Sequence, residues 1–107
     1  MEKPDMIGKF EEIALLALVK AGPRSHAAKV YQVIEDTQIK PPAFAALYTA
    51  LDRMAAKGLV TEVRDAADKR AKRLFTISAE GQQALRDAVN ATRSIEALLP
   101  GGGLAHV

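Results

Sequence analysis

The chain has 107 residues, 49% of them hydrophobic, which is enough for one small core and short for two. Its net charge is only +2, from 15 basic and 13 acidic residues, so total charge alone does not indicate a polyanionic partner. Cysteine is absent, which excludes disulfide bonds and thiolate metal sites. The longest apolar run, 13–19, is far shorter than the roughly 20 residues that cross a bilayer, so we expect a cytoplasmic protein without a membrane partner.

The first predicted helix covers Phe10 to Lys20, where Leu, Ala and Glu are frequent, and Gly22-Pro23 ends it. This helix is apolar on nearly all sides, so we expect a second packing partner for it, either a neighbouring helix or another chain. A second helix begins at a cap on Ser25 and runs to about Asp36. Two prolines, Pro41 and Pro42, separate it from the next helix.

The third predicted helix runs from about Pro42 to Lys57, and Gly58 ends it. Two alternating stretches come next, 59–64 and 73–77, and the charged residues between them are typical of a turn. They predict a β-hairpin with a solvated tip. Ser78 opens a last helix that extends to about Leu99.

Three helices followed directly by a hairpin predict a winged helix-turn-helix, a mainly α fold with a small β-hairpin (α+β). In this fold the third helix enters the major groove of DNA and the hairpin, the wing, reaches the flanking backbone. We expect a single domain over 1–107: a winged helix-turn-helix at about 8–78, an added C-terminal dimerisation helix at about 79–99, and a flexible tail at 100–107.

Three stretches carry a family likeness: Ala45–Met54 (AALYTALDRM), Lys57–Val60 (KGLV) and Arg73–Gly81 (RLFTISAEG). In this order they resemble the PadR-like transcriptional regulators, over about 10–85 of the chain. The resemblance implies a small dimeric repressor whose final helix pairs with the partner subunit. The sequence departs from the family pattern in Ala45 for glycine, in Phe75 for tyrosine, and in 26–28 (HAA) where a tyrosine-glycine often opens the second helix.

The outward face of the third helix is the predicted base-reading surface, because small side chains allow close approach to the groove floor. The side chains on this face are those of Ala43, Ala46, Thr49 and Arg53. Arg53 has an alternative role in a salt bridge with Asp52 or Glu62. Tyr48 either places its hydroxyl on a phosphate or packs only into the core. Lys40, just ahead of the helix, is placed for a backbone phosphate.

The wing supplies the remaining predicted DNA contacts. Its basic residues are Arg64, Lys69, Arg70, Lys72 and Arg73. Each phosphate that they neutralise adds salt-dependent affinity. The alternative is a merely solvated tip, since Asp65 and Asp68 partly cancel the charge.

A seam of small and apolar residues at three- and four-residue spacing predicts pairing of the last helix with another helix. The predicted dimer interface comprises Phe10 and Leu16 of the first helix and Leu85, Val89, Thr92, Ile95 and Leu99 of the last, with Ala88 in the same seam. A near-palindromic operator with two half-sites requires such a homodimer. The alternative is a monomer whose last helix folds back on its own first helix.

No catalytic constellation, metal site or cofactor is predicted. His26 and His106 are the only histidines and lie far apart, and Ser25-His26 lacks an acidic third member. The family resemblance allows a small apolar effector, although the last helix has no aromatic side chain to stack on one. The alternative function is a winged-helix protein–protein module without DNA binding, which the alanine-rich third helix and the modest charge favour.

Overall fold

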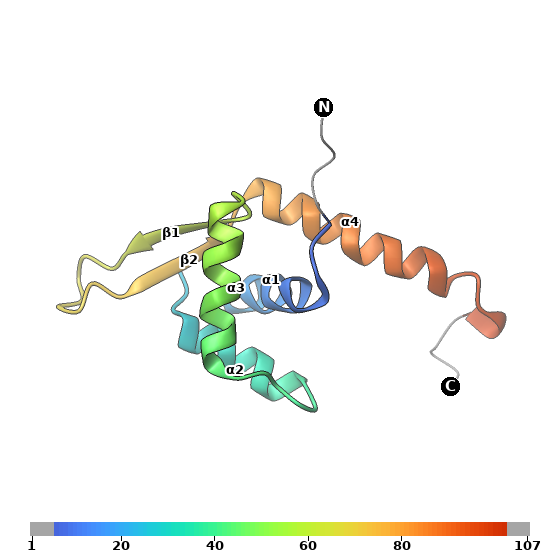
Figure 1. Cartoon of the computed structure of the whole chain (residues 1–107), viewed down its shortest axis with the longest axis horizontal. Helices are drawn as coiled ribbons and strands as arrows, with labels where there is room; N and C mark the ends of the chain where they lie inside the picture. Colours follow the sequence, from blue (N-terminus) through green and yellow to red (C-terminus); the bar gives the residue numbers. More distant parts are fainter. Residues whose placement is uncertain (1–5, 103–107) are drawn as a thin grey trace.

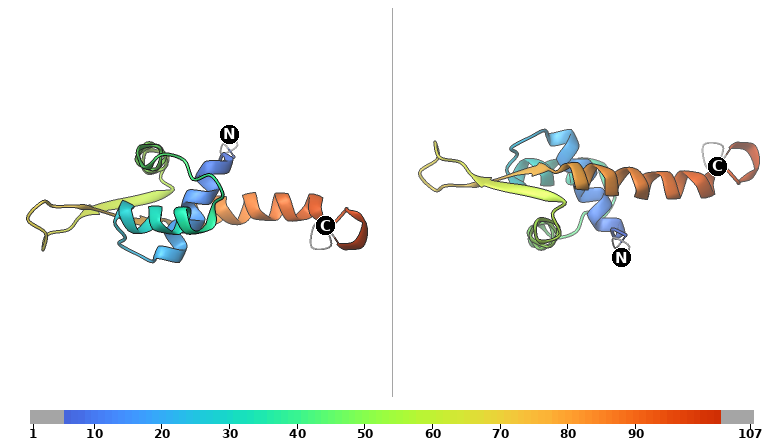
Figure 2. Two further views of the ribbon diagram at one scale, coloured as in Figure 1. Left: turned by 90° about the horizontal axis from the view of Figure 1, so that it is seen from below. Right: turned by 90° about the horizontal axis from the view of Figure 1, so that it is seen from above.

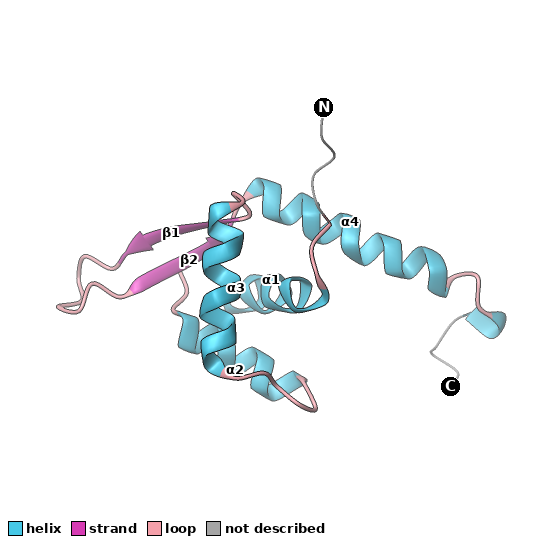
Figure 3. Ribbon diagram, in the orientation of Figure 1, coloured by secondary structure: helices cyan, strands magenta, loops and turns pink. Residues whose placement is uncertain are grey.

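A computed structural model describes residues 6–102 of the chain, and within them helices dominate and strands are confined to one hairpin (Figure 3). The elements are α1 (Lys9–Ala21), α2 (Ala27–Thr37), α3 (Phe44–Ala56), β1 (Val60–Arg64), β2 (Arg73–Ile77), α4 (Ala79–Glu96) and a short 3-10 helix, η1 (Pro100–Gly102). The predicted order of three helices, a hairpin and a final helix is confirmed. The fold is the expected winged helix-turn-helix of the α+β class. Within residues 6–102, no helix is both long enough and apolar enough to cross a lipid bilayer.

Helix α1 lies at the centre of the molecule and contacts α2, α3, α4 and β2 (Figure 1). Leu15 and Leu18 are fully buried on it, in one cluster with Leu47 of α3 and Phe75 of β2. The second partner expected for this helix is thus supplied within the same chain. Leu16 and Val19 nevertheless remain 46% and 51% exposed.

A glycine ends α1 and another ends α3, as the sequence predicts. Gly22 has φ 100° and Gly58 has φ 79°, a backbone region that other residues adopt at a cost. After Gly58 the N–H of Leu59 donates to the Met54 carbonyl at 2.9 Å, which closes the last turn of α3 as β1 begins.

The prediction that Ser25 caps α2 is wrong. The N-cap residue is His26, and Ser25 pairs with Phe75 through its backbone, with N···O distances of 3.0 and 2.9 Å. The Ser25 hydroxyl donates backward to the Gly22 carbonyl at 2.7 Å. Ser25 is 3% exposed and forms an isolated antiparallel bridge to β2.

Strands β1 and β2 form an antiparallel pair in which Glu62 faces Phe75 and Arg64 faces Arg73. The wing, residues 60–77, extends away from the helical body, and its turn is closed by the Asp65 N–H donating to the Lys72 carbonyl at 2.8 Å. Because β1 follows α3 after only three residues, the wing packs beside the end of that helix.

Helix α4 begins at a cap, as predicted: the Ser78 hydroxyl accepts the Gly81 N–H at 3.0 Å and donates to the Gly58 carbonyl at 2.6 Å. The helix ends at Glu96 and not at Leu99, because a proline at position 100 disfavours helical backbone before it. Its far half leaves the body opposite to the wing (Figure 2). Of the predicted flexible tail, 100–102 forms η1, and 103–107, with His106, lies outside the described residues.

Candidate nucleic-acid interface

The outer face of α3 carries small, exposed side chains. Thr49 and Arg53 are exposed, as is Ala43 at the N-cap, while Ala46 is half-buried. Ala45, which is absent from the predicted base-reading face, is exposed one turn before Thr49, and the Thr49 hydroxyl lies 3.3 Å from the Ala45 carbonyl. The 3.6-residue period identifies a helix face only to within about one position, which explains why Ala45 was missed.

Aromatic side chains fix the start of α3. The ring of Phe44 meets Tyr31 of α2 edge to face at 5.0 Å and Tyr48 at 5.2 Å between centroids. The Tyr31 hydroxyl donates to the Pro42 carbonyl at 2.7 Å, which holds the loop that contains Lys40. Lys40 itself is exposed three residues before the N-cap of α3.

An ion pair joins α3 to the wing, but Arg73 makes it and not Arg53. Arg73 Nε donates to Glu62 Oε2 at 2.6 Å and its Nη2 donates to Glu62 Oε1 at 2.8 Å; Nη2 also donates to Asp52 Oδ1. Among the described residues Arg53 makes no salt bridge, so the alternative role proposed for it is wrong. These carboxylates hold the Arg73 guanidinium, for which the sequence predicted a phosphate contact.

The charges of this pair stabilise each other. The hydrogen bonds from Arg73 hold the pKa of the Glu62 carboxyl below its ordinary value, and the two carboxylates raise the pKa of Arg73 above its usual range. Arg73 and Glu62 therefore remain ionised at neutral pH.

The other four basic side chains of the wing are exposed. Lys69 and Arg70 make no salt bridge within the described part of the chain, whereas Lys72 lies 3.9 Å from Asp68. Arg64 donates to the Ala71 carbonyl at 3.2 Å and remains 63% exposed. The wing therefore presents four cations toward solvent.

A cleft of about 310 Å³ separates the wing from the start of α2. It is lined by His26, Ala27, Ala28, Tyr48, Arg64, Lys72 and Arg73. Tyr48 is half-buried, lines this cleft and packs against the core. The sequence does not predict this cleft, because residues far apart in the chain form it.

The residues of the predicted dimer interface divide into two groups, one packed against the core of its own chain and one exposed. Leu85 is 9% exposed and packs into the core of its own chain, which leaves little of it for a partner; Phe10 and Val89 also pack against that core. Leu16 and Thr92 are exposed, and Ile95 and Leu99 are 68% and 40% exposed. Leu98, which is absent from the predicted interface, is 83% exposed.

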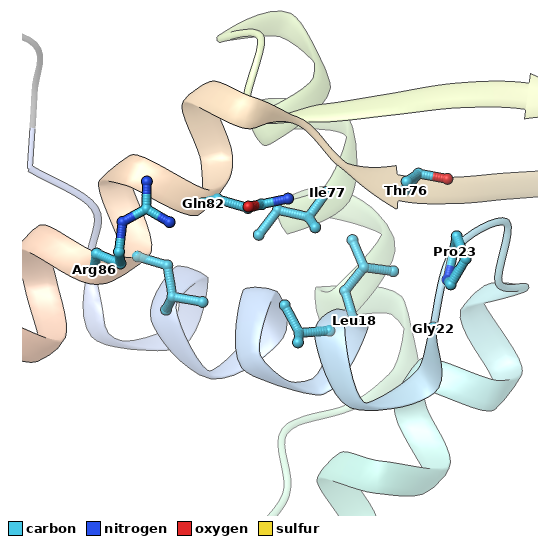
Figure 4. A pocket seen from close by; sticks show the side chains of 9 residues that line it. Leu18, Gly22, Pro23, Thr76, Ile77, Gln82 and Arg86 are labelled. Atoms are coloured by element: carbon cyan, nitrogen blue, oxygen red, sulfur yellow. The ribbon is translucent and has the colours of Figure 1, made fainter.

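An apolar hollow of about 450 Å³ lies between the end of α1, β2 and the first turns of α4 (Figure 4). Leu18, Ile77 and Leu85 line it, with Gln82 and Arg86 of α4 beside them. No group of three or more side chains suited to a metal ion occurs in residues 6–102.

The sequence matches the family model "Transcriptional regulator PadR-like family" over residues 15–87. No curated protein matches the chain.

Solved structures share the fold, among them the following three. A PadR family transcription regulator from Clostridium difficile R20291 is 17% identical, with a TM-score of 0.71 over 85% of this chain and 94% of that one. F93 from STIV, a winged-helix DNA-binding protein, is 14% identical, with a TM-score of 0.70 over 85% and 95%. RosR from H. salinarum is 22% identical, with a TM-score of 0.71 over 91% and 84%. At these identities the likeness concerns the fold.

Proposed function

Because the chain belongs to the PadR-like family of transcriptional regulators, we propose that it is a homodimeric repressor that binds duplex DNA through α3 and the wing. The observation that carries the proposal is the exposed, small face of α3 beside a wing with four solvent-facing cations. The predicted cytoplasmic location and the absence of catalysis fit this role and remain predictions.

Helix α3 would read base edges. The short side chains of Ala45, Ala46 and Thr49 let the helix backbone come close to the groove floor, and their methyl groups suit the methyl group of thymine. Arg53, one turn after Thr49 and free of any salt bridge within residues 6–102, has the reach and charge for a guanine or a phosphate.

The wing would hold the DNA backbone. Lys69 and Arg70 at its tip neutralise phosphates without regard to sequence. Arg64 and Lys72, at the cleft beside the start of α2, add charge where the backbone passes between the wing and the helices. Lys40, exposed in the loop before α3, would add a further phosphate contact.

Dimerisation would bury the apolar surface that one chain leaves open. Ile95 is exposed in the last turn of α4, Leu98 and Leu99 are exposed just after that helix, and Leu16 and Val19 are exposed on α1. A second copy related by a two-fold axis covers both patches and presents two α3 helices to a near-palindromic operator.

An apolar effector would bind in the hollow between α1, β2 and α4. Leu18, Ile77 and Leu85 supply apolar walls, and a ligand there would touch both the wing and α4. An effector that loosens DNA binding must bind the free dimer more tightly than the DNA complex.

Selection of bound sequences from a random duplex pool tests the proposed function. We expect enrichment of a near-palindromic site. The logarithm of the affinity should fall linearly with the logarithm of the salt concentration, with a slope that corresponds to several neutralised phosphates. Sedimentation of the free chain and of the complex should give two subunits per site. Failure to retain any duplex at low salt would instead support the protein–protein module.

A further inference from the structure

We propose that Arg73 fixes the position of the wing relative to α3 and thereby sets sequence specificity without touching DNA. The inference rests on the proposed DNA binding. It assigns Arg73 a positioning role in a part of the molecule where every other basic side chain of the wing faces solvent.

Arg73 meets both structural units that would face DNA. Within the wing, it forms a bidentate pair with Glu62 on the neighbouring strand, at 2.6 and 2.8 Å. Toward α3, it donates to Asp52, and its guanidinium carbon lies 5.7 Å from the ring centroid of Tyr48, one turn earlier in that helix. One side chain thus holds two successive turns of α3 against β1.

The pair sits on a rigid base. The Arg73 guanidinium carbon lies 5.0 Å from the ring centroid of Phe75, which is fully buried in the core. Only 25% of the Arg73 side chain is exposed, and all three donated hydrogen bonds end on carboxylates. A guanidinium is planar and forked, so it satisfies two carboxylates and two rings in one orientation, which a lysine ammonium does not do.

The charge of Asp52 does not explain why an aspartate stands at this position of α3. Its carboxylate is 56% exposed on α3, beside the proposed DNA surface, where a negative charge repels phosphates. Through its charge alone, an aspartate at this position weakens binding to every duplex, so its presence there needs a second explanation. We infer that it anchors α3 to Arg73 and that the gain is a fixed angle between base reading and backbone contact.

Sequence specificity depends on the angle between α3 and the wing, because the contacts of α3 with bases and those of the wing with phosphates must form together. Wing contacts with phosphates are insensitive to sequence, whereas α3 reads bases only when it enters the groove in the correct register. A loosened wing still binds DNA, but the correct site then gains less over other sites.

Arg73→Lys and Asp52→Asn test the proposal against the control Arg70→Lys. The probes are the duplex selected from the random pool and a shuffled duplex of the same composition, each titrated over a range of salt concentrations. We expect Arg73→Lys to lower the ratio of the affinity for the selected duplex to that for the shuffled duplex about tenfold. This change corresponds to the loss of a charge-assisted bidentate hydrogen bond. The salt slope should stay unchanged, because no phosphate contact is lost.

The two variants separate positioning from charge. A phosphate contact at position 73 would survive as lysine, so Arg73→Lys would match Arg70→Lys and the proposal would fail. If Asp52 acts only through its charge, Asp52→Asn would strengthen binding to both duplexes equally, which also overturns the proposal. If it positions α3, the ratio falls although a repulsive charge has been removed.

A measurement without DNA separates this inference from the proposed function. The chain has no cysteine, so spin labels attach only at introduced sites, Ala45→Cys on α3 and Val63→Cys on β1, both exposed. With the labelled chain diluted into excess unlabelled chain, so that only labels within one chain are compared, we expect one narrow label–label distance distribution in the otherwise native chain and a broader one with Arg73→Lys. An unchanged distribution overturns the positioning role, while a pool that yields no enriched duplex refutes the proposed function alone.

Discussion

Gly81 of α4 lies so close to the Leu59 carbonyl oxygen that a β-carbon at position 81 would overlap that oxygen and stand 2.8 Å from Ile77 Cγ1. Both neighbours belong to the base of the wing, and one of them is backbone. Glycine is therefore required here by space, although its φ is ordinary for a helix.

Gly81→Ala should lower the free energy of unfolding by at least about 2 kcal/mol, because backbone must move to admit the methyl group. Urea unfolding followed by circular dichroism measures the loss. The control is Gly8→Ala, where the nearest atom is 3.8 Å away, and we expect a change below about 1 kcal/mol there. Equal losses in the two variants would contradict the close approach.

Removing charge from the wing tip should weaken binding to all sequences. With Lys69→Ala and Arg70→Ala together, we expect the slope of log affinity against log salt to fall by about 2, with sequence preference retained. Arg86→Ala, an exposed arginine on α4, is the matched control. An unchanged slope would remove the wing tip from the proposed interface.

Substitution on the face of α3 should change which sequences are bound. Thr49→Gln adds a longer amide that favours adenine, so selection from a random pool should return a different site. Ala56→Gln, exposed in the last turn of α3, should return the original one. If both variants select the same site as the unmodified chain, the base-reading face lies elsewhere.

Acid should weaken the fold through Glu62. The pKa of this carboxyl is lowered in the folded chain, chiefly by hydrogen bonds from Arg73, so its stabilisation is complete above the ordinary pKa of 4.5. It is lost as the pH falls through the lowered pKa. The difference in unfolding free energy between the native chain and Glu62→Gln should therefore shrink from about pH 5 to pH 3. Urea unfolding across this range checks it, and parallel curves would contradict it.

Charges at the end of α4 should prevent dimerisation. We expect Ile95→Glu with Leu99→Glu to sediment as a monomer at micromolar concentration and to bind the selected duplex far more weakly. Its far-ultraviolet circular dichroism should be retained, because both side chains are exposed in one chain. Asn90→Glu, exposed elsewhere on α4, is the control. A native chain that is itself monomeric, alone and on DNA, would refute the dimer.

Local signals in the sequence predicted the elements well. Gly22 and Gly58 mark the ends of α1 and α3 because each adopts a positive φ, and Ser78 caps α4 because its hydroxyl reaches the N–H of Gly81. These features depend on residues that are near one another in the chain.

Predictions that depend on distant residues failed for a common reason. Ser25 has the composition of a helix cap, but its backbone is bonded to Phe75, fifty residues away. Arg53 and Arg73 are equally suited to pair with Asp52, and only the packing of the wing against α3 decides between them. Leu85 follows the same seam as Ile95, yet the body of the chain covers one and not the other.

Ser78 is the single residue between β2 and α4, and it is bonded on every side. Its N–H donates to the Leu59 carbonyl at 3.0 Å, its hydroxyl bridges Gly58 and Gly81, and its carbonyl accepts the N–H of Gln82 at 2.9 Å. Because these hydrogen bonds hold the connection between β2 and α4 rigidly, the wing and the first turns of α4 move together as one rigid unit. In the proposed homodimer, the flexibility that lets two subunits match a given half-site spacing would then lie beyond Val89, where α4 leaves the core.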